Sequence, residues 1–311
     1  MPAEALSPAP DKKAYLDPPL SSLFYTQRWK PFSEAGFWPF FFLTLYFPFG
    51  ALLCVVRVVL FFAFFLIGVF FTQFGWERII FQLAYLCLGY RWKYDASFLR
   101  STRCSQLIVC NHVSDFDGFT LYSLLPPKNV VFVVSPHMRF LARVSSFFGI
   151  KPQVVYRSAS PTPAAKDSVR QELVQVLQDA RTKVRLRRLI VFAEGAETNG
   201  RVGMLRFGKF LFGLGMPVQP MALRIRNAFG AWWPGRTSYP GDSIIRNFLY
   251  FFFVPWHTFE YKLLPPQVIR EGETDADFAD RVQRLIADEL GLVATQYTFR
   301  DKIALFKLKD R

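Results

Sequence analysis

A long and almost uncharged stretch, from Phe37 to Phe74, limits what this chain can fold into. Its one charged residue is Arg57, and phenylalanine is its most frequent residue. The stretch is longer than the ~20 residues that a helix needs to cross a bilayer, yet it is short for two full crossings joined by a turn. Soluble cores rarely need so much phenylalanine, so we expect the stretch to face lipid.

Pro48 and Gly50 divide this stretch into two unequal apolar arms, which leaves two arrangements open. In the first, a single tilted or kinked span places the N-terminal arm and the main domain on opposite sides of the membrane. In the second, a re-entrant hairpin dips into one leaflet and returns, which also suits the single phospholipid layer of a lipid droplet. Basic residues flank the stretch on both sides, so the positive-inside rule favours the hairpin with both flanks in the cytosol. They are Arg28, Lys30, Arg78 and Arg91.

The net charge and the numbers of cysteines and histidines indicate which partners and cofactors the chain can have. The 311 residues carry a net charge of +14, which indicates an anionic partner. Because no nucleic-acid-binding module is recognisable, we expect this partner to be membrane lipid and not nucleic acid. Four cysteines without a C-x-x-C pair and three scattered histidines argue against a disulfide framework and a metal site. No apolar core follows Met1 closely, so we do not expect a signal peptide.

Beyond about residue 91 the pattern becomes that of a globular α/β fold. Short apolar runs predict strands, and their alternation with helices favours a layered fold with a mixed sheet flanked by helices. The strands are expected at 107–110, 130–134, 154–156, 189–192, 218–223 and 258–264, and the helices at 115–125, 166–181 and 278–290. The apolar run 244–256 fits a core helix and an interfacial element equally well.

Four segments follow from these patterns. Residues 1–30 are expected to form a disordered N-terminal arm, because their start is rich in proline, alanine and serine. Residues 31–90 would form the membrane-embedded hairpin and a connecting helix. Residues 91–270 would form the main domain, and residues 271–311 an amphipathic helix followed by a loosely ordered basic tail.

His112 and Asp117 form the first candidate site. The histidine follows an apolar strand and the aspartate stands five positions later, a spacing that fits a turn between a strand and a helix. There Asp117 can accept the Nδ1 proton of His112 and leave Nε2 as a base. Such a base can take a proton from an alcohol that attacks a thioester. The alternative is a structural histidine, with Ser114 and Asp115 as helix caps.

This motif is the first of four that occur in order between residues 111 and 220. Together they resemble the motifs of the PlsC family of glycerol-phosphate and lysophospholipid acyltransferases, and the lysophosphatidylcholine acyltransferase branch is the most similar. Each motif is weak alone, whereas the ordered set is specific. The motifs are Asn111-His112 with Asp117, the apolar strand that ends in Arg157, Phe192-Ala193-Glu194-Gly195 with the turn Thr198-Asn199, and Pro217-Val218-Gln219-Pro220.

The resemblance implies an enzyme that transfers an acyl group to a lysophospholipid or a related glycerolipid. Acyl-CoA would be the co-substrate, with no cofactor and no metal. His112 would activate the acceptor hydroxyl, and Asp117 would orient the imidazole. Arg157 and Lys209 would bind the acceptor phosphate by charge-assisted hydrogen bonds. The other substrate-binding residues that the motifs imply are Asn111, Glu194, Gly195 and Asn199.

The third motif departs from the family pattern. Ala193 and Ala196 stand where the family has proline and threonine, and Glu197 places a negative charge where a phosphate should approach. Glu197 could repel that phosphate, or it could pair harmlessly with Arg201 or Arg206. The sequence leaves both possibilities open.

A narrower resemblance concerns the ancient ubiquitous protein 1 family of the endoplasmic reticulum and lipid droplets. It rests on the segments 45–50, 198–201 and 278–291. It implies a cytosol-facing location at these membranes, and an alternative function as a non-catalytic scaffold in lipid-droplet biology or endoplasmic-reticulum-associated degradation. Because that family adds a ubiquitin-binding module, ubiquitin-pathway partners are expected only if a longer form of this chain exists.

Overall fold

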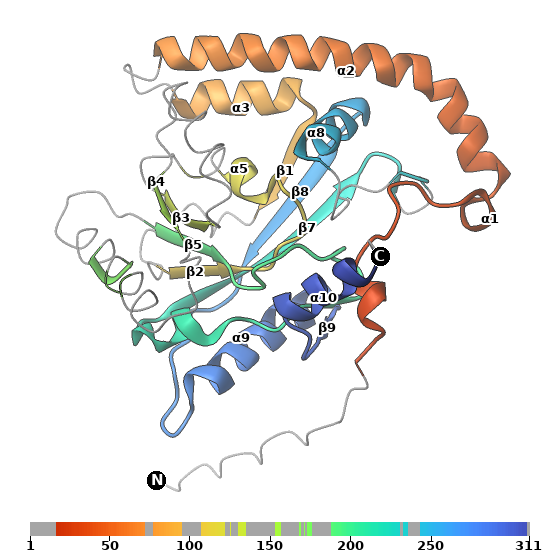
Figure 1. Cartoon of the computed structure of the whole chain (residues 1–311). Coiled ribbons are helices and arrows are strands. Elements are labelled where there is room, and N and C mark those ends of the chain that lie inside the picture. The colour runs from red at the N-terminus through yellow and green to blue at the C-terminus, as the bar shows by residue number, and fades with distance from the viewer. Residues whose placement is uncertain are drawn as a thin grey trace, which may run out of the picture.

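The fold is built around one seven-stranded mixed sheet with helices on both faces (Figure 1). This computed structural model describes residues 17–71, 77–94, 107–121, 125, 130–134, 153–156, 168, 171, 173–175, 188–230, 233–235 and 243–309. The expected helix at 166–181 therefore lies mostly outside the described residues. The expected layered α/β fold is confirmed.

The sheet has the strand order β1-β8-β7-β2-β5-β3-β4. Neighbouring strands are parallel except for β7 and β8, which form an antiparallel pair. The predicted strands are all present, whereas β1 was not predicted, because its charged residues interrupt the apolar pattern. The strands are β1 (Tyr90–Tyr94), β2 (Leu107–Cys110), β3 (Val130–Val134), β4 (Gln153–Tyr156), β5 (Arg188–Phe192), β7 (Val218–Asn227) and β8 (His257–Leu263).

The central strand β2 is buried on both faces, which explains its unbroken apolar sequence. Ile108 and Cys110 point into one hydrophobic cluster, together with Phe251 of the helix α8 (Ile244–Phe253). Leu107 and Val109 point into the other. Cores on both faces fix the strand, and hence the position of the loop that follows Cys110.

The helix α9 (Asp275–Leu290) covers the second of these faces, together with the short helix η5 (Lys209–Leu214) (Figure 1). It begins with a capping box between Thr274 and Asp277 and ends at Gly291, as the sequence pattern predicts for its C-terminus. Phe278, Val282 and Ile286 are fully buried from one stripe of the helix. Each such side chain contributes about 1.5–3 kcal/mol on burial.

The helices α2 (Phe37–Phe71), α3 (Glu77–Cys87) and α8 lie over the first face (Figure 1). One side of α2 packs on the domain through Leu43, Tyr46, Val58 and Phe61. Its other side carries exposed apolar residues along most of its length, and the window 37–64 is long and apolar enough to cross a membrane. The exposed residues include Trp38, Phe42, Leu45, Phe49, Leu52, Val55, Val59, Phe62 and Leu66.

The expected reversal of the chain at Pro48 and Gly50 is wrong. Both residues lie inside α2, which bends toward its N-terminal end but continues as one helix (Figure 1). A proline inside a helix removes one hydrogen bond and bends the axis, which does not by itself reverse the chain. The absence of a side chain at Gly50 allows α2 and α8 to pack closely, because a Cβ there would lie 2.5 Å from Cε2 of Phe253 in α8.

The two ends of the described chain are also more ordered than expected. The 3-10 helix η1 (Leu20–Leu23) and the C-terminal helix α10 (Phe299–Lys309) pack together over the residues on either side of β6 (Gly203–Met204). Leu23 and Phe24 are buried against Leu205, with Phe306 beside them. The prediction of a disordered arm is therefore wrong for residues 17–30, and the prediction of a loose C-terminal tail is wrong for 299–309. Residues 1–16 lie outside the described part. The strand β9 (Val293–Ala294) pairs with β6.

Candidate active site

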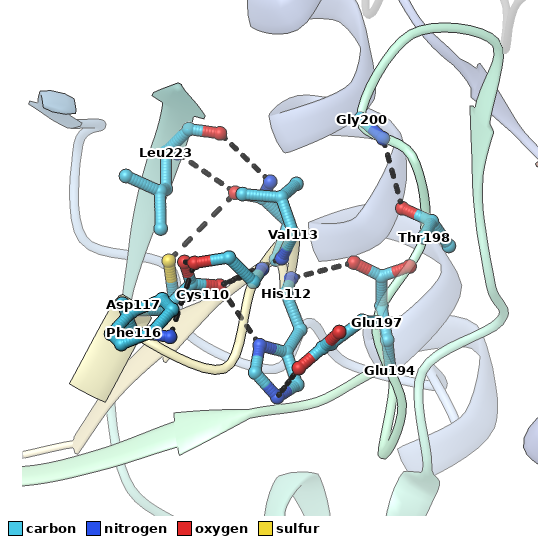
Figure 2. Close-up of polar contacts among 12 residues, drawn as sticks. Cys110, His112, Val113, Phe116, Asp117, Glu194, Glu197, Thr198, Gly200 and Leu223 are labelled. Carbon is cyan, nitrogen blue, oxygen red and sulfur yellow. Dashed lines mark hydrogen bonds and ion pairs between the residues drawn. The ribbon is translucent and has the colours of Figure 1, made fainter. Parts of the chain in front are cut away.

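His112 and Asp117 face each other across the turn that leaves the central strand. β2 ends at Cys110, and the helix α5 (Asp117–Leu121) begins with the aspartate itself. The Nδ1 atom of His112 lies 2.8 Å from Oδ2 of Asp117 (Figure 2). This is the arrangement that the five-residue spacing predicts.

The carboxylate of Asp117 is held by a set of converging donors. Oδ2 also accepts hydrogen bonds from the backbone N–H groups of Val113 (2.7 Å) and Ser114 (3.0 Å). Oδ1 accepts from the hydroxyl of Ser114 at 2.7 Å. Asp117 is fully buried, and these donors engage both of its carboxylate oxygens. Asp117 is therefore fixed as an acceptor for the Nδ1–H of His112.

The backbone of His112 is clamped from the opposite side by Glu194 in the loop after β5. Oε1 of Glu194 accepts from the N–H of His112 and Oε2 accepts from the N–H of Leu205, both at 2.8 Å. The carbonyl of His112 accepts from the N–H of Thr198 at 2.9 Å. Burial raises the pKa of Glu194 to about 7, although these backbone hydrogen bonds oppose the shift. Both oxygens of Glu194 thus hold the loop that carries the histidine.

The imidazole of His112 stacks on the ring of Phe192, with centroids 4.5 Å apart. Its Nε2 atom points away from Asp117 and lies 4.0 Å from Oε1 of Glu197 (Figure 2). Burial lowers the pKa of His112, but the hydrogen bond to Asp117 and the surrounding carboxylate charges raise it by more. The net pKa of this histidine therefore lies above its ordinary value.

The structure shows the contacts of Glu197 and of the two arginines that were considered as its partners. Arg206 pairs with Asp280, at 2.7 and 2.8 Å, and the guanidinium of Arg201 lies over the ring of Tyr25. Glu197 instead faces His112 and forms a side-chain hydrogen bond with Asp115. Burial raises the pKa of Glu197 to about 8, and the contact with Asp115 adds to the shift.

Two of the predicted substrate-binding residues are engaged in holding the fold. Asn111 is fully buried and exchanges two hydrogen bonds with the backbone of Leu223, at 2.8 and 2.9 Å, which fastens the end of β2 to β7. Asn199 donates from its side chain to the carbonyl of Ser22 at 2.6 Å and from its backbone to that of Leu23 at 2.7 Å. It therefore ties the segment before α2 to the loop of the third motif.

Three further residues were predicted to bind substrate: Gly195, Lys209 and Arg157. Gly195 forms the turn after β5, where its N–H donates to the carbonyl of Phe192 at 3.1 Å. Lys209 is exposed at the first position of η5. Arg157 lies outside the described residues. Within the described part of the chain, no cluster of three or more histidine, cysteine or carboxylate side chains could hold a metal ion.

Two residues near His112 were missed by the sequence interpretation. Asp115 was considered only as a helix cap, yet it contacts Glu197 and accepts from the side chain of Asn247 at 2.5 Å. Lys302 of α10 donates from Nζ to the backbone carbonyl of Glu197 at 2.8 Å. No sequence signal could have found Lys302, because it follows Glu197 by more than a hundred positions and lies outside the four motifs.

Comparison with known proteins shows which proteins this chain is similar to. Residues 99–224 match the model of the acyltransferase family. A zebrafish (Danio rerio) protein named lipid droplet-regulating VLDL assembly factor AUP1 is 31% identical over 86% of this chain and 58% of its own length. A Drosophila melanogaster lysophosphatidylcholine acyltransferase is 24% identical over 66% of this chain and 36% of its own length. The chain thus spans less than two thirds of either relative.

A solved structure gives a weaker likeness. The 1-acyl-sn-glycerophosphate acyltransferase PlsC from Thermotoga maritima superposes with a TM-score of 0.48 at 15% identity, over 76% of this chain and 97% of its own. The family match and the two relatives confirm the resemblance that the four motifs predict.

Proposed function

We propose, from the acyltransferase domain at residues 99–224, that the chain transfers an acyl group from acyl-CoA to a lysophospholipid or a related glycerolipid at a membrane surface. The observation that carries the proposal is the 2.8 Å contact between Nδ1 of His112 and Asp117. It fixes the tautomer in which Nε2 is a free base, directed away from the aspartate. An acceptor hydroxyl bound at Nε2 would meet the group that removes its proton.

In the proposed reaction, Nε2 of His112 takes the hydroxyl proton as the acceptor oxygen attacks the thioester carbonyl. Asp117 stabilises the imidazolium that forms, because its charge is fixed 2.8 Å from Nδ1. When the carbon–sulfur bond breaks, the imidazolium returns the proton to the departing thiolate. The products are the acylated lipid and free CoA, and no residue of the chain is acylated.

The packing at both ends of α2 supports a monotopic attachment to one membrane face. Before α2, the carbonyl of Leu23 accepts from Asn199, and the N–H of Lys30 donates to the carbonyl of Pro234, each at 2.7 Å. After α2, the chain continues through α3 into β1 of the same sheet. A crossing that put the two ends of α2 on opposite sides would break the first set of contacts. These contacts support both flanks lying on one side of the membrane. We propose that this side is the cytosol, at the endoplasmic reticulum and lipid droplets, because basic residues flank α2.

The helix α8 supports the same placement. Ile245 and Leu249 are exposed, 68% and 44%, while Phe251 and Phe252 of the same helix are buried in the core. The helix therefore serves as both a core element and an interfacial one, on the face that carries α2. Exposed apolar side chains next to α2 would enlarge the area that enters the lipid layer.

The test is acyl transfer by the purified protein in nanodiscs, with labelled oleoyl-CoA and a panel of lysophospholipids and other glycerolipids. His112→Ala should abolish transfer, while Lys262→Met should retain it, because the exposed amine of Lys262 pairs with Glu289 of α9. Thermal unfolding of each variant would verify that it is folded. Transfer by folded His112→Ala at the wild-type rate would refute the assignment of the base.

A second candidate function is a non-catalytic membrane scaffold in lipid-droplet biology. The close approach of Glu197 to Nε2 favours it, because a protonated carboxyl there could occupy the base. The name of the zebrafish relative, a lipid droplet-regulating factor, points the same way. If folded wild-type protein transfers no acyl group to any acceptor yet binds lipid droplets, the scaffold is favoured. Ubiquitin-pathway partners would belong to this candidate only in a longer form of the chain.

A further inference from the structure

The turn 197–199, which follows the third motif, lies directly against the loop that carries the base (Figure 2). The N–H of Thr198 donates to the carbonyl of His112 at 2.9 Å, and Thr198 is 2% exposed. Close by in the chain, Gly200 packs so tightly that a Cβ there would lie 2.7 Å from Cγ1 of Val113. The position of this turn and the position of His112 are therefore linked.

Lys302 of α10 holds the same turn from a distant part of the chain. Its Nζ donates to the carbonyl of Glu197 at 2.8 Å and lies 5.1 Å from the centroid of the Phe24 ring. Burial lowers the pKa of this amine, and the charges of Glu197, Glu194 and Asp115 oppose the shift. An amine N–H donates in either protonation state, so the hydrogen bond does not depend on the charge of those carboxyl groups.

The lysine is fixed in place by the packing of α10. Phe306, one turn further along the helix, packs edge-on against Phe24, with ring centroids 5.8 Å apart. At the start of the helix, the carboxylate of Asp301 accepts from the N–H and the hydroxyl of Thr298, at 2.6 and 2.7 Å. A side chain that projects from a helix held at its start and along one face presents its donor at a defined position.

We propose that Lys302 is a positioning residue for the base, because it fixes the turn 197–199 and, through Thr198, the backbone of His112. The inference rests on the proposed acyl transfer, and it extends that site beyond residues 99–224, the part that matches the acyltransferase family. In this role Lys302 touches neither the acceptor nor acyl-CoA. It acts on the geometry of the base, and a displacement of about 1 Å can lower a rate by about 10²-fold.

The experiment compares Lys302→Met with wild type in nanodiscs, using the acceptor that wild type acylates. Methionine keeps most of the length of the side chain and removes its donor. kcat should fall by about 10- to 100-fold, whereas KM for oleoyl-CoA and for the acceptor should change by less than about 3-fold, because the lost contact is made to the loop of the base. Lys307→Met is the matched control, since Lys307 is an exposed lysine of the same helix, and it should keep the wild-type values.

Amide hydrogen exchange separates this inference from the proposed activity. In Lys302→Met, a peptide that contains Thr198 should exchange at least about 5-fold faster, whereas a peptide from β7 should keep its wild-type rate. Unchanged exchange at Thr198 would overturn the inference. An equal acceleration in β7 would also overturn it, because that result reports a general loss of stability.

The kinetic outcomes decide the rest. An unchanged kcat, or a change confined to KM, would show that the turn does not position the base, and would overturn the inference while acyl transfer stands. If wild type transfers no acyl group to any acceptor, the proposed function fails. Hydrogen exchange alone then decides whether Lys302 holds the turn against His112: faster exchange at Thr198 supports it, and unchanged exchange overturns it.

Discussion

Arg57 is the charged residue that fastens the apolar helix α2 to the rest of the domain. It is 4% exposed, and its guanidinium donates to the carbonyls of Phe252 (2.9 Å), Val254 (2.5 Å) and Pro255 (2.5 Å). These carbonyls belong to the last turn of α8 and the residues just after it, where backbone acceptors lack partners within the helix. A cation at a helix C-terminus also interacts favourably with the helix dipole.

Replacement of Arg57 by methionine keeps most of the apolar volume and removes all three donors. Phe252 and Val254 are buried, so at least two carbonyls would be left without partners. Each unsatisfied buried acceptor costs about 1–3 kcal/mol, which gives a loss of about 2–6 kcal/mol. At about 2 °C per kcal/mol for a domain of this size, the Tm should fall by roughly 4–12 °C.

The assay is thermal unfolding of the purified protein in detergent, followed by tryptophan fluorescence. Arg91→Met is the matched control, because Arg91 is an exposed arginine whose guanidinium lies 4.1 Å from the centroid of the Trp256 ring. Loss of that cation–π contact costs about 0.5–1 kcal/mol, so the Tm should fall by about 1–2 °C. If Arg57→Met lowers the Tm no more than this control, the buried arginine does not hold α2 against α8.

Three further outcomes follow from the geometry of the loop that carries the base. In wild type, kcat/KM should rise with pH through a pKa above 6.5, because only neutral His112 is a base and its pKa is raised; a pH-independent rate would contradict this. Asp117→Asn should lower kcat/KM by about 10²- to 10⁴-fold. It should also shift the rise of kcat/KM to lower pH, because the hydrogen bond and charge that raise the pKa of His112 are lost; a rise at the wild-type pH would count against the pair of His112 and Asp117. Gly200→Ala should destabilise the protein by about 1–3 kcal/mol in a denaturant titration, because φ is +61° and the new Cβ would lie 2.7 Å from Cγ1 of Val113. Gly208→Ala, where no atom lies within 4 Å of the added Cβ, should change stability little.

Local periodicity was sufficient for much of the fold. The apolar runs of β2, β3 and β5 identified buried strands, and the stripe of α9 with its terminal Gly291 identified a helix and its end. These patterns are readable because a strand or helix with a buried face must repeat its apolar residues at a fixed period. Where charged residues broke the period, as in β1, the element was missed.

The fold of the apolar stretch could not be predicted in the same way. Pro48 and Gly50 are turn residues in isolation, yet both lie inside α2, because Gly50 allows Phe253 to approach and the bend at a proline is tolerated. The ordered segments η1 and α10 were also missed. Both are short, and they pack on one another and on Leu205 through contacts between distant segments, which no local pattern reveals.

For the site, the sequence by itself determined the pair of His112 and Asp117, since a strand-to-helix turn of five residues leaves few other ways for them to meet. It also identified Glu197 as a negative charge at the position where a phosphate would approach in the family pattern. Only the tertiary structure decided that Glu197 faces Nε2 of His112 while Arg206 pairs with Asp280, and that Lys302 reaches the same loop. Spacing along a chain fixes geometry only within one turn or one element, whereas charges brought together from distant elements are set by how the elements pack.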